Sequence, residues 1–227
     1  MNGNSSNEMP EIIEHAVEFV ECTPMASLQV AMAARTCYRS EKPMTISEAD
    51  DFVKMLIRKG HESPLEFAHI TLRITTSRDI THELVRHRLA SYAQESTRYV
   101  RYKHGVQKVR PVEIKEYLDD GTPNPAYLVW LDGCRAAEKA YIELLRITHR
   151  PEIARTVLPG STRTTIMMQM NMREFRHFLR LRMAPAAHPD MRYVASLCHA
   201  EAVQHGLGIF LEDLQLPQWC WQNTVKE

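Results

Sequence analysis

Residues 66–88, EFAHITLRITTSRDITHELVRHR, join a strand pattern directly to a helix pattern. Apolar and polar side chains alternate over residues 68–74, which is typical of a strand with one buried face. Ser77 can cap the helix that follows, and Asp79 lies in its first turn, where the helix dipole favours an acidic side chain. We therefore expect a strand and then a helix that ends with the basic triplet RHR (86–88).

Strands and helices alternate on both sides of this stretch. Thr45 and Glu48 match a capping box, and Gly60 follows the helix that they begin. We expect strands over 15–23, 100–111 and 162–171, and helices over 24–37, 45–59, 125–149, 171–183 and 189–214, with a short helix from 151. This order predicts an α/β (α+β) fold with a mostly antiparallel sheet flanked by helices. We expect a single domain over residues 11–227, after a disordered tail over residues 1–10.

Composition restricts the class of function. The 28 Lys and Arg balance the 28 Asp and Glu, so no bulk attraction to nucleic acid is expected. Residues 78–110 contain eight Lys or Arg against three acids, and residues 150–182 contain seven Arg against two acids, which indicates a focused site for a small polyanion. The five cysteines form no CxxC pair, and no stretch resembles a signal or a membrane span, so we expect a cytoplasmic protein. Neither GxGxxG nor GxxxxGK[ST] is present, so neither a Rossmann nor a P-loop site is expected.

The residues 86–99, RHRLASYAQESTRY, are the strongest candidate for a site. The planar fork of arginine matches phosphate and carboxylate oxygens, so we interpret the stretch as an anion-binding loop for a nucleotide. A solvated basic loop is the alternative. His87 is expected to be uncharged between two arginines, and Ser96 is more consistent with a phosphate contact than with a nucleophile, because no GxSxG elbow surrounds it. From pattern alone Arg182 is a surface charge, with a guanidinium inserted into the site as the alternative.

Six motifs, in order, resemble the flavin-dependent thymidylate synthases. They are GHESPLEF (60–67), HELVRHR (82–88), its RHR followed after seven residues by Ser96, QESTRY (94–99), IARTVLP (153–159) and NMREFRHFLRLR (171–182). The resemblance implies an α/β fold assembled as a homotetramer, with sites shared between subunits. It implies FAD as cofactor and methylation of dUMP to dTMP, with methylenetetrahydrofolate and NADPH as co-substrates. A nucleotide- or RNA-binding module without chemistry is the alternative, against which the zero net charge argues.

The same resemblance implies the residues of the site. The dUMP contacts would be Glu83, Leu84, Val85, Arg86, Gln94, Glu95, Ser96, Thr97, Arg98, Arg155 and Arg182. The FAD contacts would be Ser63, Arg86, His87, Arg88, Gln94, Asn171, Arg173 and His177. Arg182 would be the catalytic group, polarising the uracil so that C5 becomes a nucleophile, and no metal is implied. Phe67 stands where many members have His, so a flavin contact there is not expected.

Overall fold

The structure is a computed structural model, and it describes residues 10–37, 39–40, 43–102, 105–214 and 216. These residues form two compact units. The first unit contains Met1–His15, Thr76–Thr81 and Gln94–Thr165, and the second contains Ala16–Thr75, His82–Ala93 and Ile166–Glu227. The chain passes between the units several times without a linker, so composition gave no sign of the division.

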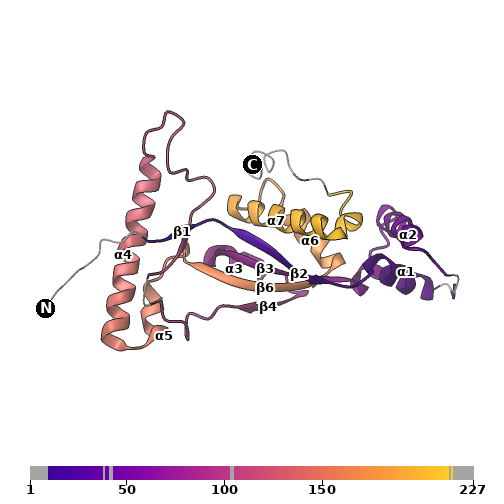
Figure 1. Cartoon of the computed structure of the whole chain (residues 1–227), viewed down its shortest axis with the longest axis horizontal. Coiled ribbons are helices and arrows are strands. Elements are labelled where there is room, and N and C mark those ends of the chain that lie inside the picture. Colours follow the sequence, from indigo (N-terminus) through magenta and orange to yellow (C-terminus); the bar gives the residue numbers. More distant parts are fainter. Residues whose placement is uncertain (1–9, 38, 41–42, 103–104, 215, 217–227) are drawn as a thin grey trace. The chain divides into compact units, whose positions relative to one another are not determined.

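A four-stranded sheet has the order β2 (Ala16–Cys22), β3 (His69–Ser77), β6 (Arg163–Asn171), β4 (Ala90–Gln94) (Figure 1). Strands β2 and β3 are antiparallel, with a register shift between Phe19 and Glu21. Ile70, Leu72 and Ile74 are fully buried, which confirms the alternation predicted for this strand. The sheet is mostly antiparallel, as expected from the sequence.

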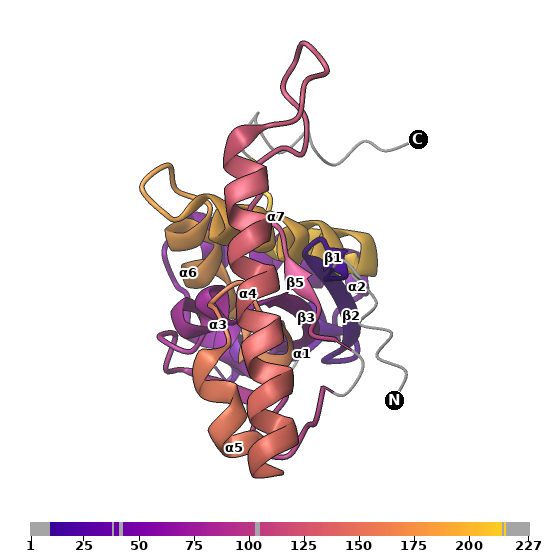
Figure 2. The ribbon, with the colours of Figure 1, turned by 90° about the vertical axis from the view of Figure 1, so that its left-hand side faces the viewer.

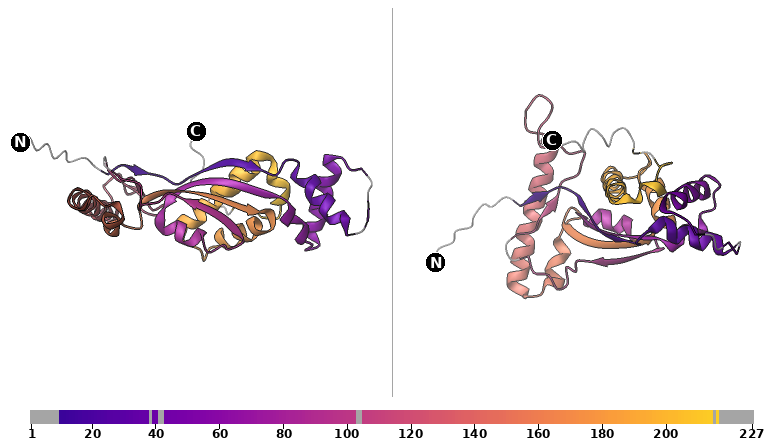
Figure 3. Two further views of the ribbon diagram at one scale, coloured as in Figure 1. Left: turned by 90° about the horizontal axis from the view of Figure 1, so that it is seen from below. Right: turned by 45° about the vertical axis from the view of Figure 1, so that its right-hand side comes forward.

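The second unit contains four of the longer helices. Helices α1 (Ala26–Thr36) and α2 (Ile46–Arg58) pack on each other, as Figure 3 shows. Helix α7 (Pro189–Ala202) packs on β2 and on α6 (Met172–Arg182). Thr45 and Glu48 form the predicted capping box of α2, and Gly60 adopts a φ of 70° after its end, where only glycine is free of strain. The short helix η1 (Ser63–Phe67) carries the GHESPLEF motif.

The first unit is built around the long helix α4 (Pro125–Thr148), beside which α5 (Pro151–Ala154) packs (Figure 2). The helix η2 (Arg155–Val157) follows α5, and β1 (Ile12–Ile13) pairs in parallel with β5 (Lys108–Val109). Val106, Tyr141 and Ala154 form the centre of a buried cluster that Tyr102, Leu144, Leu145, Val157 and Leu158 surround.

The helix that leads to RHR is shorter than predicted. Helix α3 spans Arg78–Leu84, and RHR lies in the turn beyond it. The Tyr92 hydroxyl lies 2.7 Å from the carbonyl oxygen of Leu84 and 3.1 Å from that of His87, and its single proton is shared between these two acceptors. The Leu84 carbonyl thus has a side-chain partner where a continuing helix would supply the amide of residue 88, and this favours termination of the helix.

Three further expectations are corrected. Ala90–Gln94, predicted as loop, is strand β4, because it pairs with β6 far along the chain. The strand expected over 100–111 is reduced to β5 among the described residues. The last helix, α7, ends at Ala202. It is followed by two short helical turns, η3 (Val203–Leu207) and η4 (Gly208–Phe210), and the φ of 83° at Gly206 prevents a continuous α-helix here. The terminal WCWQ lies outside the described residues.

Candidate active site

The predicted site residues fall into both units. Those in the second unit are Ser63, Glu83, Leu84, Val85, Arg86, His87, Arg88, Asn171, Arg173, His177 and Arg182. Those in the first unit are Gln94, Glu95, Ser96, Thr97, Arg98 and Arg155.

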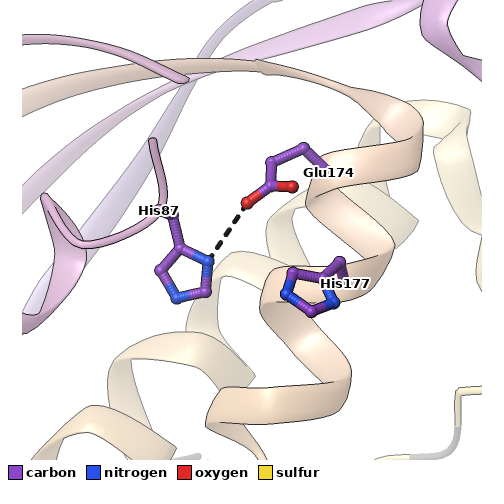
Figure 4. A group of neighbouring side chains, drawn as sticks. All are labelled: His87, Glu174 and His177. Carbon is purple, nitrogen blue, oxygen red and sulfur yellow. Dashed lines mark hydrogen bonds and ion pairs between the residues drawn. The ribbon is translucent and has the colours of Figure 1, made fainter. Parts of the chain in front are cut away.

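His87 lies at the centre of a hydrogen-bonded cluster in the second unit, which also contains Glu83, Glu174 and Arg182 and which we call the arginine–histidine cluster. The Nδ1 atom of His87 lies 3.2 Å from Oε1 of Glu174. Its Nε2 atom lies 3.0 Å from Nε of Arg182. A guanidinium N–H can only donate, so Nε2 accepts and the imidazole proton resides on Nδ1, which donates to the carboxylate. Figure 4 shows the bond between His87 and Glu174.

The surroundings of His87 favour the uncharged form of its imidazole. Burial lowers the pKa of His87, and the positive charge of Arg182 lowers it further, while the hydrogen bond to Glu174 acts in the opposite direction. The sequence predicted a neutral imidazole from the two flanking arginines. The direction of this prediction agrees with the structure, but the main cause is burial, and the cation beside the ring is Arg182.

Arg182 ends α6 with its side chain 19% exposed. Its Nη1 atom lies 2.6 Å from Oε2 of Glu83, and its Nη2 atom donates to the carbonyl of Glu83 at 3.1 Å. Together with the bond to His87, these contacts engage three of the five N–H groups of the guanidinium. Within the part of the chain that the structure describes, two N–H groups are left for a further acceptor, on a cation whose orientation is fixed from three sides. The surface-charge interpretation of Arg182 is therefore wrong.

His87, Glu174 and His177 are also close enough for a metal ion, since one ligand atom from each lies within 4.8 Å of the others (Figure 4). The donor set does not favour that use. Both nitrogens of His87 already have partners, and the Arg182 cation stands 3.0 Å from Nε2. A metal ion would have to displace one of these bonds and tolerate the neighbouring positive charge.

A pocket of about 430 Å³ in the second unit brings together two of the predicted flavin contacts, Arg88 and Asn171. His69, Ser91 and Gln169 line it as well. Its guanidinium and amide groups offer N–H donors that suit the anionic and carbonyl oxygens of a flavin nucleotide. The Asn171 side-chain oxygen caps α6 by accepting from the amide of Glu174 at 2.9 Å, so its amide group is the part left to a ligand.

The remaining predicted residues of this unit differ in exposure. Ser63, Val85, Arg86 and His177 are exposed. Arg173 is exposed too and pairs with Glu66, Nη1 to Oε1 at 2.6 Å. The Leu84 side chain is fully buried, so only its backbone can reach a ligand. Phe67, where many family members have His, is 60% exposed.

Glu95 and Gln94 are firmly held within the first unit. The Glu95 carboxylate accepts from Arg163 at 2.7 Å and from the Tyr102 hydroxyl at 2.6 Å. The amide nitrogen of Gln94 donates to the hydroxyls of Thr81 at 2.9 Å and Thr164 at 3.2 Å. Both side chains are half-buried, and their orientation is fixed before any ligand binds.

Residues 96–98 of the QESTRY motif also lie in the first unit. Arg155 donates from Nη1 to the hydroxyl of Thr97 at 3.3 Å, which brings these two predicted dUMP contacts together. The Ser96 hydroxyl accepts from the amide of Arg98 at 3.3 Å. Arg98 is exposed and lines a pocket of about 510 Å³ together with Tyr99, Arg101, His149, Arg150, Pro151 and Glu152. The concentration of guanidinium groups at this pocket suits an anion.

Comparison with known proteins identifies the family. The family model described as thymidylate synthase complementing protein matches residues 18–205. Flavin-dependent thymidylate synthases from Geobacter sulfurreducens and Thermococcus onnurineus are each 34% identical; the matches cover 79% and 73% of this chain and 78% and 74% of those proteins. The chain belongs to the flavin-dependent thymidylate synthase family. The resemblance drawn from the motifs is thereby confirmed.

A solved structure agrees with this membership. The UMP/dUMP methylase PolB from Streptomyces cacaoi, bound with 5-Br dUMP, superposes with a TM-score of 0.73 at 25% identity, over 89% of this chain and 95% of that one. Within the described part of this family member, no helix combines the length and the apolar character needed to cross a bilayer.

In this flavin-dependent thymidylate synthase, the sequence resemblance missed three polar residues that hold predicted site residues in place. Glu174 fixes His87, Arg163 pairs with Glu95, and the Tyr92 hydroxyl holds the turn that carries RHR. The one available signal for Glu174 was its spacing from His177, since residues three apart share a helix face. Burial raises the pKa of Tyr92 to about 12, so its phenol remains a donor.

Proposed function

We propose that the chain methylates dUMP to dTMP, with methylenetetrahydrofolate as carbon donor and NADPH as reductant. The observation that carries this proposal is the guanidinium of Arg182, held by Glu83 and His87 with two N–H groups left over. Membership in the flavin-dependent thymidylate synthase family supports it.

Arg182 has the properties that uracil activation requires. A fixed cation beside the pyrimidine ring stabilises the negative charge that develops on the ring, and this makes C5 a nucleophile without an enzyme thiol. Because Glu83 and His87 hold the guanidinium beforehand, little reorganisation is needed when charge develops. The half-buried position of the side chain strengthens the interaction, since fewer water molecules screen it.

The first unit contributes the groups for the rest of the nucleotide. Arg98 and Arg155 offer guanidinium donors for the phosphate, with the hydroxyls of Ser96 and Thr97 beside them. Glu95 and Gln94 present polar atoms for the sugar or the base. In the second unit, Glu83 and the backbone of Leu84, Val85 and Arg86 complete the proposed set.

The proposed flavin contacts are Ser63, Arg86, His87, Arg88, Gln94, Asn171, Arg173 and His177. FAD, when bound, supplies the hydride chemistry that reduces the transferred methylene, and NADPH restores its reduced form. Arg88 and Asn171 share a pocket whose donors suit such a ligand. Arg173 would exchange its bond to Glu66 for one to the ligand, or keep it and act as an oriented cation.

We further propose a cytoplasmic homotetramer in which neighbouring subunits complete each site, built from a domain over residues 11–227 after a tail over residues 1–10. Light scattering after size-exclusion chromatography tests the assembly, and a species of four chains is expected. Mixing inactive variants altered in different units, for example at Arg98 and at Arg182, should restore activity if subunits share sites.

The decisive experiment is tritium release from C5-labelled dUMP, with and without methylenetetrahydrofolate and NADPH. Release that depends on the co-substrates, from a yellow protein with a flavin absorption band, is the expected result. A colourless protein that binds RNA with a strong salt dependence would instead support a binding module without chemistry.

A further inference from the structure

The geometry points to Glu174 as a positioning residue for Arg182, acting through the tautomer of His87. This inference rests on the proposed role of Arg182 in dUMP activation. No contact between Glu174 and a ligand is required, because its effect passes through two hydrogen bonds, Glu174 to His87 and His87 to Arg182.

Glu174 occupies an unusual place for a carboxylate. It lies in the first turn of α6, three residues after the capping Asn171, and it is only 7% exposed. Such a position usually uses the carboxylate for a capping box or leaves it in water. Here its side chain turns instead toward Nδ1 of His87, as Figure 4 shows. The positive end of the helix dipole helps to keep the carboxylate charged in this buried place.

The carboxylate determines which nitrogen of His87 carries the proton. A neutral imidazole has one donor and one acceptor, and a carboxylate can only accept. The proton therefore lies on Nδ1, and Nε2 presents its lone pair to Nε of Arg182 at 3.0 Å. With the opposite tautomer, two N–H groups would face each other at this distance. The guanidinium would then have to move away from the ring.

Arg182 itself favours an acceptor at Nε2, and apart from it the other described rings around His87 make no hydrogen bond that would control the tautomer. The ring of Phe178 meets the imidazole edge-on with centroids 5.2 Å apart, and the ring of His177 lies at 6.1 Å. Protonation of His87 would not rescue the contact, because an imidazolium also donates from Nε2. Among the described residues, Glu174 is thus the side chain that sets the acceptor for Arg182.

A double-mutant cycle between Glu174→Ala and His87→Asn tests this chain of contacts. Asn at 87 can still donate to Glu174 but cannot reach Arg182, so it removes only the second link. We expect Glu174→Ala to lower kcat for dTMP formation roughly 10- to 100-fold, with a smaller change in KM for dUMP and bound flavin retained. In the His87→Asn background, Glu174→Ala should lower kcat by less than about twofold more, because the link is already broken.

Nuclear magnetic resonance of the wild-type protein labelled with 15N-histidine gives a readout besides activity. The His87 signals, identified by their loss in His87→Asn, should show the proton on Nδ1, and Glu174→Ala should shift them toward the other tautomer. Because the tautomer is measured on the wild type, the test holds even if Glu174→Ala fails to fold. A proton on Nε2 in the wild type would overturn the inference.

Asp213→Ala is the matched control. Arg176 lies on α6, as Glu174 does, and it donates to the Asp213 carboxylate at 2.6 and 2.8 Å. Asp213 makes no bond to the arginine–histidine cluster. It should lower stability and leave kcat per bound flavin within about twofold of wild type. Unchanged kcat in Glu174→Ala, or kcat losses that simply multiply in the double variant, would refute the positioning role. If the wild type releases no tritium from dUMP, the proposed function fails, while the tautomer measurement still judges the inference alone.

Discussion

Arg182→Ala is the substitution whose effect the structure defines best. It removes three hydrogen bonds at once, one to Nε2 of His87 and two to Glu83. The His87 acceptor is buried, and leaving it unpaired costs about 1–3 kcal/mol of folding free energy. The Glu83 side chain is 33% exposed, so water screens that pair and its loss costs only about 0.5–1 kcal/mol. We expect the free energy of unfolding to fall by about 1.5–4 kcal/mol in all.

The effect on the reaction should be larger than the effect on folding. A fixed donor that stabilises charge in a transition state is worth about 3–4 kcal/mol, or roughly 10²- to 10³-fold in kcat. Urea unfolding, flavin absorbance and tritium release from C5-labelled dUMP are measured on the same preparations. We expect flavin content to stay within about twofold of wild type while dTMP formation is lost.

Arg180→Ala is the control for this experiment. Arg180 lies two residues before Arg182 and pairs with Glu62 at 3.0 Å, but its side chain is 42% exposed. Its removal should cost less than about 1 kcal/mol and leave kcat unchanged. If Arg182→Ala loses flavin and activity in equal proportion, or keeps more than about a tenth of the wild-type kcat, the role given to the guanidinium is wrong.

Three further predictions concern other parts of the chain. Arg98→Ala should weaken dUMP binding at least about tenfold and leave flavin binding unchanged, as calorimetry can measure, because it removes a phosphate donor. Tyr102→Phe should lower the free energy of unfolding by about 1 kcal/mol in urea titrations, since it deletes one donor to Glu95. The hydrogen bond from Arg176 lowers the pKa of Asp213 below its ordinary value of 3.8. The pair therefore stabilises the fold above pH 3.8, and this contribution is lost as the pH falls through the lowered pKa of the folded protein. Asp213→Asn should make the urea midpoint less dependent on pH in this acid range.

The parts of the fold that the sequence predicts well are those decided by local chemistry. The capping box of α2 and the glycine that follows α2 are each decided by residues within about one turn of the chain. The alternation in β3 follows from one buried face. Strand β4 escaped prediction because Ala90–Gln94 is short and largely polar, and it becomes a strand only through pairing with β6, more than 70 residues further on.

The same distinction applies to the site. Resemblance to the family pointed to His87 and Arg182, but the contact between His87 and the carboxylate of Glu174 on α6 is a tertiary contact across 87 residues. Viewed within its own helix, Glu174 is an ordinary acid in a first turn. The spacing to His177 shows that they share a helix face, but nothing local shows that this face is turned toward His87.

The number of arginines in a stretch is a weaker indicator of chemistry than the partners that hold each one. RHR attracts attention because its cations are adjacent, yet Arg86 and Arg88 are exposed. Arg182 stands in a helix rich in arginine and has a surface-like pattern, but three of its N–H groups are engaged by His87 and Glu83. A cation can stabilise a transition state without reorganising only if its other donors are already engaged. Whether those donors have partners is a property of the packing, and for that reason the role proposed for Arg182 was the hardest of the group to recognise from pattern.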